Sequence, residues 1–302
     1  MMPITEMEDE RRLMADVAQR VAARRTAAFA AARLPLLEAE LAGAVDGLGA
    51  ELGVVQAALA RAVGTEGRAG RRWRPLLTFA AAEACGAPPA AAAPAAAAVE
   101  LTHTASLVLD DLPCMDDGES RRGNAATHRL VGPAGAILVA VGLLGRAAEL
   151  LARSPRGAAE LGAEWGHCIG LRGMSGGQAV DLAGWHGGPA RRLLRAKTTA
   201  LSALALSAGA RVAGASPSSA AALAAYGRGL GWAYQLADDA ADAAEDAAAG
   251  KRPGGRVPLR QGARLMRAAE RTLRACGELD RAGVELLVAF GRTVVATPAV
   301  PA

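Results

Sequence analysis

The sequence predicts an all-α fold, and three observations support that prediction. Alanine, the strongest helix former and a poor strand former, makes up about a quarter of the 302 residues. Apolar residues recur at helical spacing, and no stretch alternates convincingly as a β-strand would. Hydrophobic residues make up 52% of the chain and charged residues 21%, which excludes a disordered chain and favours a sizeable core. We therefore expect a bundle of helices.

Proline and glycine separate the expected helices along the chain. Three prolines make Gly86–Ala95 a turn or loop despite its alanines, and Gly64–Gly70 is a polar, glycine-rich break. No linker or shift in composition divides the chain, so we expect one domain over residues 1–302, with frayed ends at 1–15 and 297–302. The expected helices cover residues 6–33, 35–62, a segment from Pro75, 96–112, 134–152, 157–182, 189–213, 218–249 and 260–293.

Charge and cysteine usage point to a cytoplasmic protein that does not bind nucleic acid. The formal charge of +4 comes from scattered arginines, and only 3% of residues are aromatic, so a base-stacking surface is disfavoured. The four cysteines form no CxxC pair, which favours cytosolic thiols over a zinc framework. The N-terminus is acidic and lacks the apolar core of a signal peptide. The longest apolar run, Leu130–Gly145, is broken by proline and glycine, so we expect a buried core helix and no transmembrane segment.

The first chemical motif is Asp110-Asp111-Leu-Pro-Cys-Met-Asp116-Asp117, at the end of an expected helix. His103 and Ser106 precede Asp110 by two turns and one turn, so the three share a helix face. An aspartate-rich segment of this kind is either a solvated helix end or a site for a cation. The motif alone leaves both interpretations open.

A second acidic motif places Gln235, Asp238, Asp239 and Asp242 on one helical stripe. Carboxylates at this spacing repel one another, and each resists ionisation unless a cation compensates. Mg²⁺ is a suitable cation, because it takes oxygen ligands and bridges carboxylates to substrate phosphates. Two such motifs, each preceded by apolar sequence on a separate helix, favour a magnesium site over two solvated surfaces.

Lysine is rare in this chain, and its two positions invite a functional interpretation. Lys197 and Lys251 are the only lysines among 34 basic residues. A compact ammonium differs from a planar guanidinium as a phosphate ligand, so both positions are candidates for binding diphosphate. Arginines also cluster at 71–74 and 121–122, and their forked side chains suit diphosphate oxygens.

Together these motifs resemble those of trans-isoprenyl diphosphate synthases. The resemblance covers roughly residues 60–260, in family order, and is closest to bacterial geranylgeranyl diphosphate synthases, which share the Pro-Cys-Met insert. Beside the two aspartate motifs, the matching segments are Gly70-Arg71-Arg72-Trp-Arg74-Pro75, Glu100-Leu-Thr-His103, Arg121-Arg122-Gly123, Gly176-Gly177-Gln178-Ala-Val-Asp181-Leu182 and Lys197-Thr198.

The resemblance implies a helical bundle around a deep apolar cavity, with the two aspartate motifs facing each other at its mouth. It implies a homodimer that joins isopentenyl diphosphate to an allylic diphosphate in isoprenoid biosynthesis, such as carotenoid biosynthesis. The implied magnesium ligands are Asp110, Asp111, Asp116, Asp238, Asp239 and Asp242. The implied ligands of the allylic diphosphate are Arg121, Lys197, Thr198, Gln235 and Lys251, and those of isopentenyl diphosphate are Arg71, Arg74, His103 and Arg122.

The length of the product depends on what blocks the cavity below the first aspartate motif. Ala105 and Ser106 are both small, where farnesyl-producing relatives usually carry an aromatic residue at the first of these positions. An open floor favours the twenty-carbon product, geranylgeranyl diphosphate. The alternatives are a farnesyl diphosphate synthase, a class I terpene cyclase, a weakly active regulatory subunit of a synthase, and a helical scaffold that binds partners.

Overall fold

A computed structural model describes the backbone of residues 4–46, 50–67, 69–185, 188, 190–248 and 259–296. It describes the side chains of residues 20–46, 51–67, 69–185, 188, 190–240 and 261–295. Lys251 lies outside the described residues, and so does the side chain of Asp242.

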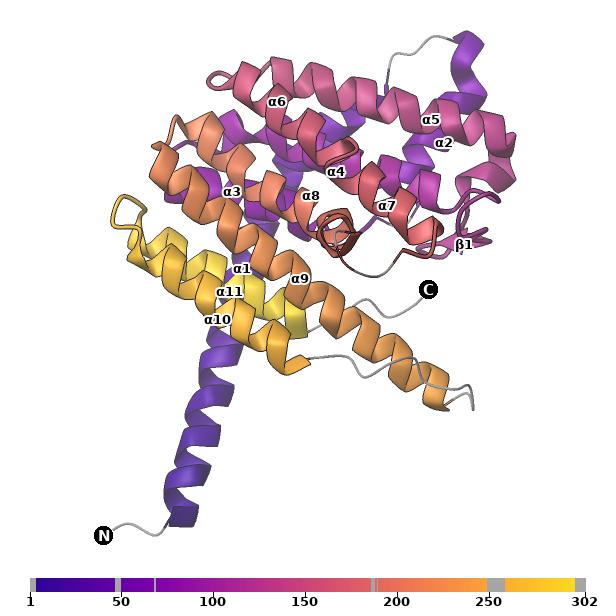
Figure 1. Cartoon of the computed structure of the whole chain (residues 1–302). Coiled ribbons are helices and arrows are strands. Elements are labelled where there is room, and N and C mark those ends of the chain that lie inside the picture. The colour runs from indigo at the N-terminus through magenta and orange to yellow at the C-terminus, as the bar shows by residue number, and fades with distance from the viewer. Residues whose placement is uncertain are drawn as a thin grey trace.

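The prediction of an all-α fold is confirmed, since helices make up nearly all of the regular structure in the described chain (Figure 1). Two short strands form a hairpin in which Ser120 pairs with Ala125 and Arg121 with Asn124. The elements are α1 (Ile4–Val45), the 3₁₀ helix η1 (Ala50–Leu52), α2 (Gly53–Val63), α3 (Trp73–Ala84), α4 (Pro89–Asp110), β1 (Ser120–Arg121), β2 (Asn124–Ala125), α5 (Thr127–Ala152), α6 (Ala158–Ile169), α7 (Met174–Leu182), α8 (Ala190–Ala213), α9 (Pro217–Ala248), α10 (Leu259–Ala275) and α11 (Arg281–Ala296).

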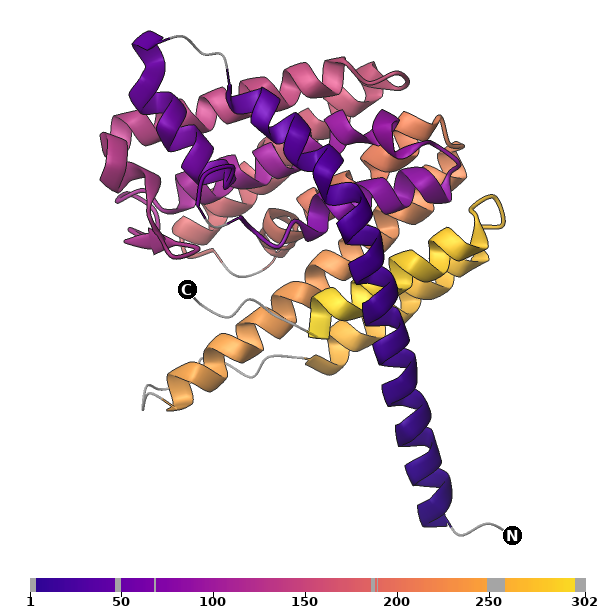
Figure 2. The same cartoon turned by 180° about the vertical axis from the view of Figure 1, so that it is seen from behind.

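Helices α4 and α8 form the centre of the bundle. Helix α4 contacts α1, α2, α3, α5 and α8, while α8 contacts α3, α4, α6, α7 and α9. Seen from behind, α1 runs across the bundle, and its N-terminal part projects beyond it (Figure 2). Helices α10 and α11 lie alongside α9 (Figure 1). The first aspartate motif begins at the end of α4, Lys197 and Thr198 lie on α8, and the second aspartate motif lies on α9, which packs on α8. The packing of α8 against its neighbours therefore determines how these residues meet.

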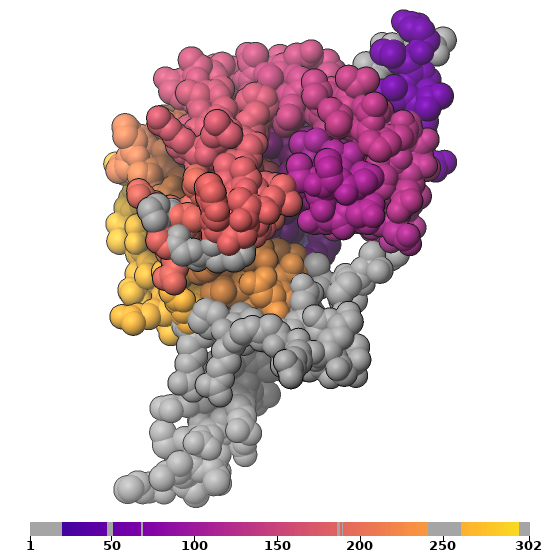
Figure 3. Space-filling view, turned by 45° about the vertical axis from the view of Figure 1, so that its right-hand side comes forward, coloured from indigo at the N-terminus to yellow at the C-terminus, as the bar shows by residue number. Residues whose placement is uncertain are grey.

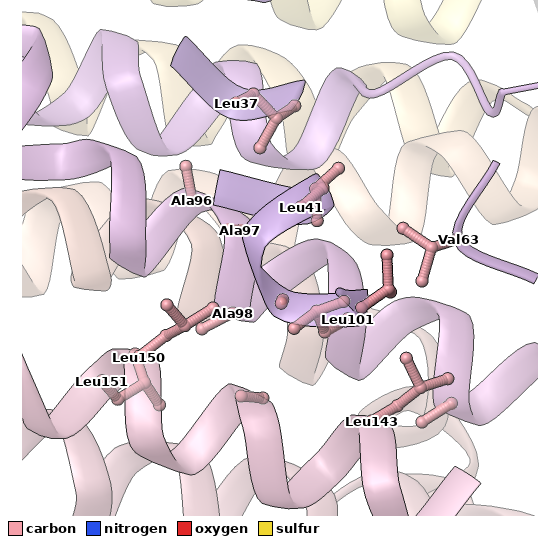
Figure 4. Packing of buried hydrophobic residues seen from close by; sticks show 14 of the residues in the cluster. Leu37, Leu41, Val63, Ala96, Ala97, Ala98, Leu101, Leu143, Leu150 and Leu151 are labelled. Carbon is pink, nitrogen blue, oxygen red and sulfur yellow. The ribbon is translucent and has the colours of Figure 1, made fainter. Parts of the chain in front are cut away.

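Small residues allow α8 to approach the neighbouring helices α3 and α9 closely. A Cβ atom at Gly209 would lie 2.4 Å from the carbonyl oxygen of Thr78, between α8 and α3. A Cβ atom at Gly227 would lie 2.3 Å from the carbonyl oxygen of Ser202, between α9 and α8. Only glycine fits at contacts this short. Alanine has a similar role in the largest core cluster, where Ala96, Ala97 and Ala98 of α4 lie between leucines of α1 and α5 (Figure 4).

Two predicted breaks at proline are wrong. Helix α1 continues through Pro35, and α4 begins at Pro89 and continues through Pro94. Proline suits the first turn of a helix, which explains Pro89, whereas Pro94 removes one backbone hydrogen bond. Burial of the alanines around Pro94, from Ala92 to Ala98, compensates for that loss.

Two other predicted helices are each divided in the structure. The segment 157–182 forms α6 and α7, because the chain turns sharply at Gly170–Gly173. A Cβ atom at Gly173 would lie 2.1 Å from the carbonyl oxygen of Cys168, so the turn requires glycine there. The segment 260–293 likewise forms α10 and α11. Residues 4–15, expected to fray, belong to α1.

The prediction that Leu130–Gly145 is a buried helix is wrong for one of its faces. Helix α5 packs Val139 and Leu143 into the core, whereas Leu138 is 65% exposed and Val141 59% exposed. The reason is that α4 and its neighbours cover only one side of α5. Helices α4 and α5 are both long and apolar enough to cross a membrane, but the apolar window of α4 is 72% buried in the bundle, against 28% for α5.

Candidate active site

The first aspartate motif begins where α4 ends. The backbone N–H of Asp116 donates to the carbonyl oxygen of Asp110 at 2.9 Å, so the loop folds back and brings these two residues together. Asp111 instead points into the protein and is 2% exposed. The guanidinium of Arg121 donates to its carboxylate from Nε at 3.1 Å and from Nη2 at 2.5 Å. Asp110 and Asp116 are therefore available to a ligand, whereas Asp111 is held by Arg121.

Burial makes Asp110 unusual electrostatically. Desolvation raises the pKa of its carboxyl group to about 6. The nearby carboxylates of Asp116 and Asp111 raise it further, while Lys197 and Arg121 oppose these effects. At neutral pH Asp110 is ionised, at a cost in free energy that an added cation would reduce.

Lys197 connects α8 to α7. Its Nζ donates to Oδ2 of Asp181 at 2.7 Å. A Cβ atom at Gly177 would lie 2.5 Å from Cβ of Lys197, so the glycine of α7 lets the two helices meet here. On the same helix, Nε2 of Gln178 lies 3.8 Å from Sδ of Met115, within the loop of the first aspartate motif. Helix α7 thus lies between Lys197 and that loop.

The residue after Lys197 reaches the second aspartate motif. Oγ1 of Thr198 donates to Oε1 of Gln235 at 3.3 Å, and Nε2 of Gln235 donates to Oδ1 of Asp239 at 2.6 Å. Lys197 is linked to the first motif through α7, so two consecutive residues of α8 join the two motifs. Asp238 is partly buried on the same segment of α9.

A group of arginines lies next to these motifs, at the start of α3. Nη2 of Arg71 donates to the hydroxyl group of Tyr234 at 3.0 Å. The ring of Tyr234 lies 5.5 Å from that of Trp73, and the guanidinium of Arg74 stacks 4.2 Å from the Trp73 ring. Tyr234 immediately precedes Gln235, so this contact holds the basic segment beside the second motif.

Arg74 and His103 form a partly buried pair. Nη1 of Arg74 lies 3.1 Å from Nε2 of His103. Desolvation and the positive charge of Arg74 lower the pKa of His103 well below its usual value, so the ring is neutral. Desolvation lowers the pKa of Arg74 to about 10, and the nearby charges of Arg122 and Arg71 contribute. The buried Nε of Arg74 makes no hydrogen bond within the described protein. These arginines form a positively charged site that can accept an anion.

Arg72 has a structural role that the sequence did not distinguish from that of its neighbours. It is 4% exposed and binds Oε1 of Glu38 at 3.0 Å and Oε1 of Glu100 at 2.8 Å. Arg122 lies 3.9 Å from the same Glu100 oxygen and packs against Gly70, where a Cβ atom would lie 2.4 Å from its Cζ. Glu100 belongs to the matching segment Glu100-Leu-Thr-His103, and an acidic residue at an expected buried helix position was the one sequence feature that could have predicted this ion-pair network.

The two predicted product-length residues point in different directions. Ser106 is partly exposed and donates to the carbonyl oxygen of His103 at 2.8 Å. Ala105 is fully buried in the core cluster that contains Ala136 and Val139 of α5. Of the two, only Ser106 lies on the face of α4 that carries Asp110.

The surface near these residues is hollowed. Figure 3 shows a depression between the loop after α4, the region around α7 and helix α9. A separate pocket of about 30 Å³ lies behind Asp111, between Arg61 and Thr104. Among the described side chains, no group of three or more His, Cys, Asp or Glu is arranged to hold a metal ion by itself.

Comparison with known proteins agrees with this arrangement. The polyprenyl synthetase family model matches residues 57–256, a span that contains both aspartate motifs. The chain belongs to the polyprenyl synthetase family. The predicted resemblance to trans-isoprenyl diphosphate synthases is therefore confirmed at the level of the family.

The chain is similar to several proteins that are named as prenyl diphosphate synthases. Geranylgeranyl pyrophosphate synthase 12, chloroplastic, from Arabidopsis thaliana is 35% identical over 243 residues, which are 75% of this chain and 67% of that protein. The heterodimeric geranylgeranyl pyrophosphate synthase large subunit 2 of Arabidopsis thaliana is 43% identical over 123 residues, 38% of this chain and only 31% of that protein. The crystal structure of an FPP/GFPP synthase from Zymomonas mobilis has a TM-score of 0.76 at 28% identity, covering 91% of this chain and 99% of that one.

Proposed function

We propose that this polyprenyl synthetase condenses isopentenyl diphosphate with an allylic diphosphate and releases geranylgeranyl diphosphate. One observation carries the proposal. Lys197 binds Asp181 of α7, the helix whose Gln178 contacts Met115 in the first aspartate motif, and the next residue, Thr198, binds Gln235 of α9. Both acidic motifs therefore converge on one short segment of α8, where a single diphosphate could contact both.

Two adjacent regions of opposite charge suit two diphosphate substrates. Asp110, Asp116 and Asp239 form the acidic region, which binds a diphosphate only through a cation. Arg71, Arg74 and Arg122 form the basic region, which binds an anion directly. We assign isopentenyl diphosphate to the basic region, where the free Nε–H of Arg74 faces no hydrogen-bond acceptor within the described residues. The allylic diphosphate then belongs beside Lys197 and Thr198, with Arg121 and the predicted ligand Lys251.

The acidic residues fit Mg²⁺ chemically. Asp110 and Asp116 are brought together by the loop after α4 and supply oxygen ligands, and Mg²⁺ is commonly held by one or two carboxylates together with substrate phosphates. Asp110 and Asp116 would hold it on one side, and Asp238, Asp239 and Asp242 on the other. We leave out Asp111, because Arg121 already binds its carboxylate. When bound, Mg²⁺ would neutralise negative charge on the leaving diphosphate.

The reaction requires stabilisation of the charge on the departing diphosphate and exclusion of water from the allylic cation, and it requires no acidic or basic side chain as a proton donor or acceptor. Lys197 and Arg121 stabilise the negative charge that grows on the departing diphosphate. The positioned isopentenyl double bond then attacks the allylic cation before water reaches it. The proton released from the condensed product passes to the departed diphosphate, so no dedicated basic side chain is required. His103 is neutral and bonded to Arg74, which makes it a positioning residue for that guanidinium.

We propose geranylgeranyl diphosphate as the product because Ser106, one turn below Asp110, leaves room for a growing chain. The names of the relatives support this length without fixing it, since one is a geranylgeranyl and another an FPP/GFPP synthase. The relatives named above by sequence are plant enzymes, so the proposed likeness to bacterial geranylgeranyl diphosphate synthases rests on the Pro-Cys-Met insert alone. A role in carotenoid precursor synthesis is part of the same proposal. The remaining alternatives are a farnesyl diphosphate synthase and a weakly active regulatory subunit of a synthase.

We also propose that the protein is a cytoplasmic homodimer that buries the exposed face of α5. Leu138 and Val141 on that face are apolar, and α5 has no neighbour from the described chain covering it. Substituting both with glutamate should convert the dimer into a monomer in light scattering, whereas the exposed Leu265→Glu on α10 should not. A wild-type protein that sediments with vesicles instead would assign the face to a membrane.

A product assay tests the proposed function. The purified protein is incubated with Mg²⁺, labelled isopentenyl diphosphate and, in separate reactions, geranyl or farnesyl diphosphate, and the products are sized by chromatography and mass spectrometry. A twenty-carbon product that disappears with EDTA supports the proposal. A fifteen-carbon product from geranyl diphosphate, with no further extension, would instead establish a farnesyl diphosphate synthase. Absence of any condensation would favour a regulatory subunit.

A further inference from the structure

A small core cluster lies below the proposed diphosphate site, between α4, α6 and α8. Val99 lies three turns below Asp110 on α4, and Leu201 and Leu204 lie one and two turns below Lys197 on α8. These three side chains belong to one buried cluster with Cys168 of α6. The two helix faces that begin at the diphosphate therefore converge on this cluster.

Trp165 of α6 packs against this cluster and also against the larger core cluster around α4 and α5. Its ring is held in place by a hydrogen bond, because Nε1 donates to Oγ1 of Thr102 at 2.9 Å. Thr102 is 1% exposed and donates in turn to the carbonyl oxygen of Ala98 at 2.7 Å. The indole therefore has a fixed orientation rather than filling a loose gap.

Because the indole of Trp165 is bonded to Thr102, the position of Thr102 along α4 gives the distance of the indole from Asp110. Thr102 lies one turn below Ser106 and two turns below Asp110, a rise of about 12 Å at 1.5 Å per residue. Ser106, at the first turn, is small and partly exposed, so it places no large side chain there. A large, anchored side chain at the next turn is the first rigid obstacle that an elongating chain meets.

The geometry points to Trp165 as the residue that stops chain elongation in this protein. This inference rests on the proposed function, and it differs from the sequence-based prediction, which placed the length control at Ala105 and Ser106. Trp165 binds Thr102, two turns of α4 away from Asp110, so it would act on product length and not on ionisation. Removing the indole should let the chain extend by at least one more isoprene unit.

The test compares Trp165→Ala and Trp165→Phe with the wild type under the assay conditions above. We expect the share of products longer than the wild-type product to rise at least tenfold in Trp165→Ala. Trp165→Phe retains a large ring and should keep the wild-type length. Leu161→Ala is the matched control, since Leu161 is fully buried one turn earlier on α6 and its loss also leaves a core cavity. It should lower the melting temperature without changing product length.

An active Trp165→Ala protein with the wild-type product distribution would overturn the inference, as would a longer product from Leu161→Ala. If Trp165→Ala does not fold, Trp165→Leu replaces it, with the same expected shift and the same contradicting result. A wild-type protein that forms no condensation product would overturn the proposed function itself, which separates the two failures.

Discussion

Nη1 of Arg74 lies 3.1 Å from Nε2 of His103, so a charged guanidinium donates to a neutral imidazole inside the protein. The pair leaves Nε of Arg74 without an acceptor in the described protein, beside other arginines that disfavour its charge. An arriving diphosphate would supply the missing acceptor. In a buried ion pair a carboxylate of the protein would occupy this place, so the missing acceptor indicates a site for an anionic ligand.

Arg74→Met should raise the KM for isopentenyl diphosphate about 30-fold or more, because a charge-assisted hydrogen bond contributes roughly 2–3 kcal/mol. The KM for the allylic substrate should change much less. Steady-state kinetics with each substrate varied in turn measures the split. Arg264→Met, on the exposed surface of α10, is the control. An equal rise in both KM values would contradict the assignment.

Asp110→Asn should stabilise the protein near pH 7 while abolishing condensation. Since burial raises the pKa of Asp110 in the folded state, its contribution to stability is present at low pH and is lost as the pH rises from about 4 through about 6. The amide removes the cost of the buried charge, a gain of about 1–2 kcal/mol at pH 7. Denaturant unfolding at pH 4 and pH 7 measures it. Equal stability of the two proteins at both pH values would count against this electrostatic account.

Thr198→Val should lower kcat/KM about five- to tenfold, because it removes the hydrogen bond of about 1 kcal/mol that fixes Gln235 beside Asp239. Thr199→Val is a matched control on the adjacent residue, whose hydroxyl donates to the carbonyl oxygen of Arg195 in its own helix. Its effect on kcat/KM should be less than twofold. Similar losses in both variants would show that α8 itself, and not the contact to α9, is being disturbed.

Arg72→Ala should destabilise the fold by about 3 kcal/mol, because it removes the hydrogen-bonded cation of the buried Glu100 carboxylate and leaves only the more distant Arg122, at 3.9 Å. Thermal unfolding measures the effect. Arg33→Ala breaks a half-exposed pair with Glu83 and should cost only about 1 kcal/mol. A fully stable Arg72→Ala protein with a raised KM for isopentenyl diphosphate would mean that Arg72 binds substrate.

Local sequence was sufficient for some features and misleading for others. The helical content follows from alanine and from apolar spacing, both of which act within a few residues. The breaks at Pro35 and Pro94 were mispredicted, because burial against distant helices outweighs one lost hydrogen bond. The turn at Gly173 was missed for a related reason, since the carbonyl that requires a glycine becomes visible only in the folded chain.

The sequence by itself determined the helical class, the family and the two acidic motifs, because these are properties of composition and of spacing along one helix. Only the tertiary structure decided which charges are used. It turned Asp111 toward Arg121, buried Arg72 between Glu38 and Glu100, and placed Trp165 on Thr102. The physical reason is that a charge or a ring acquires its role from the groups packed around it, and those groups come from helices far apart in the chain.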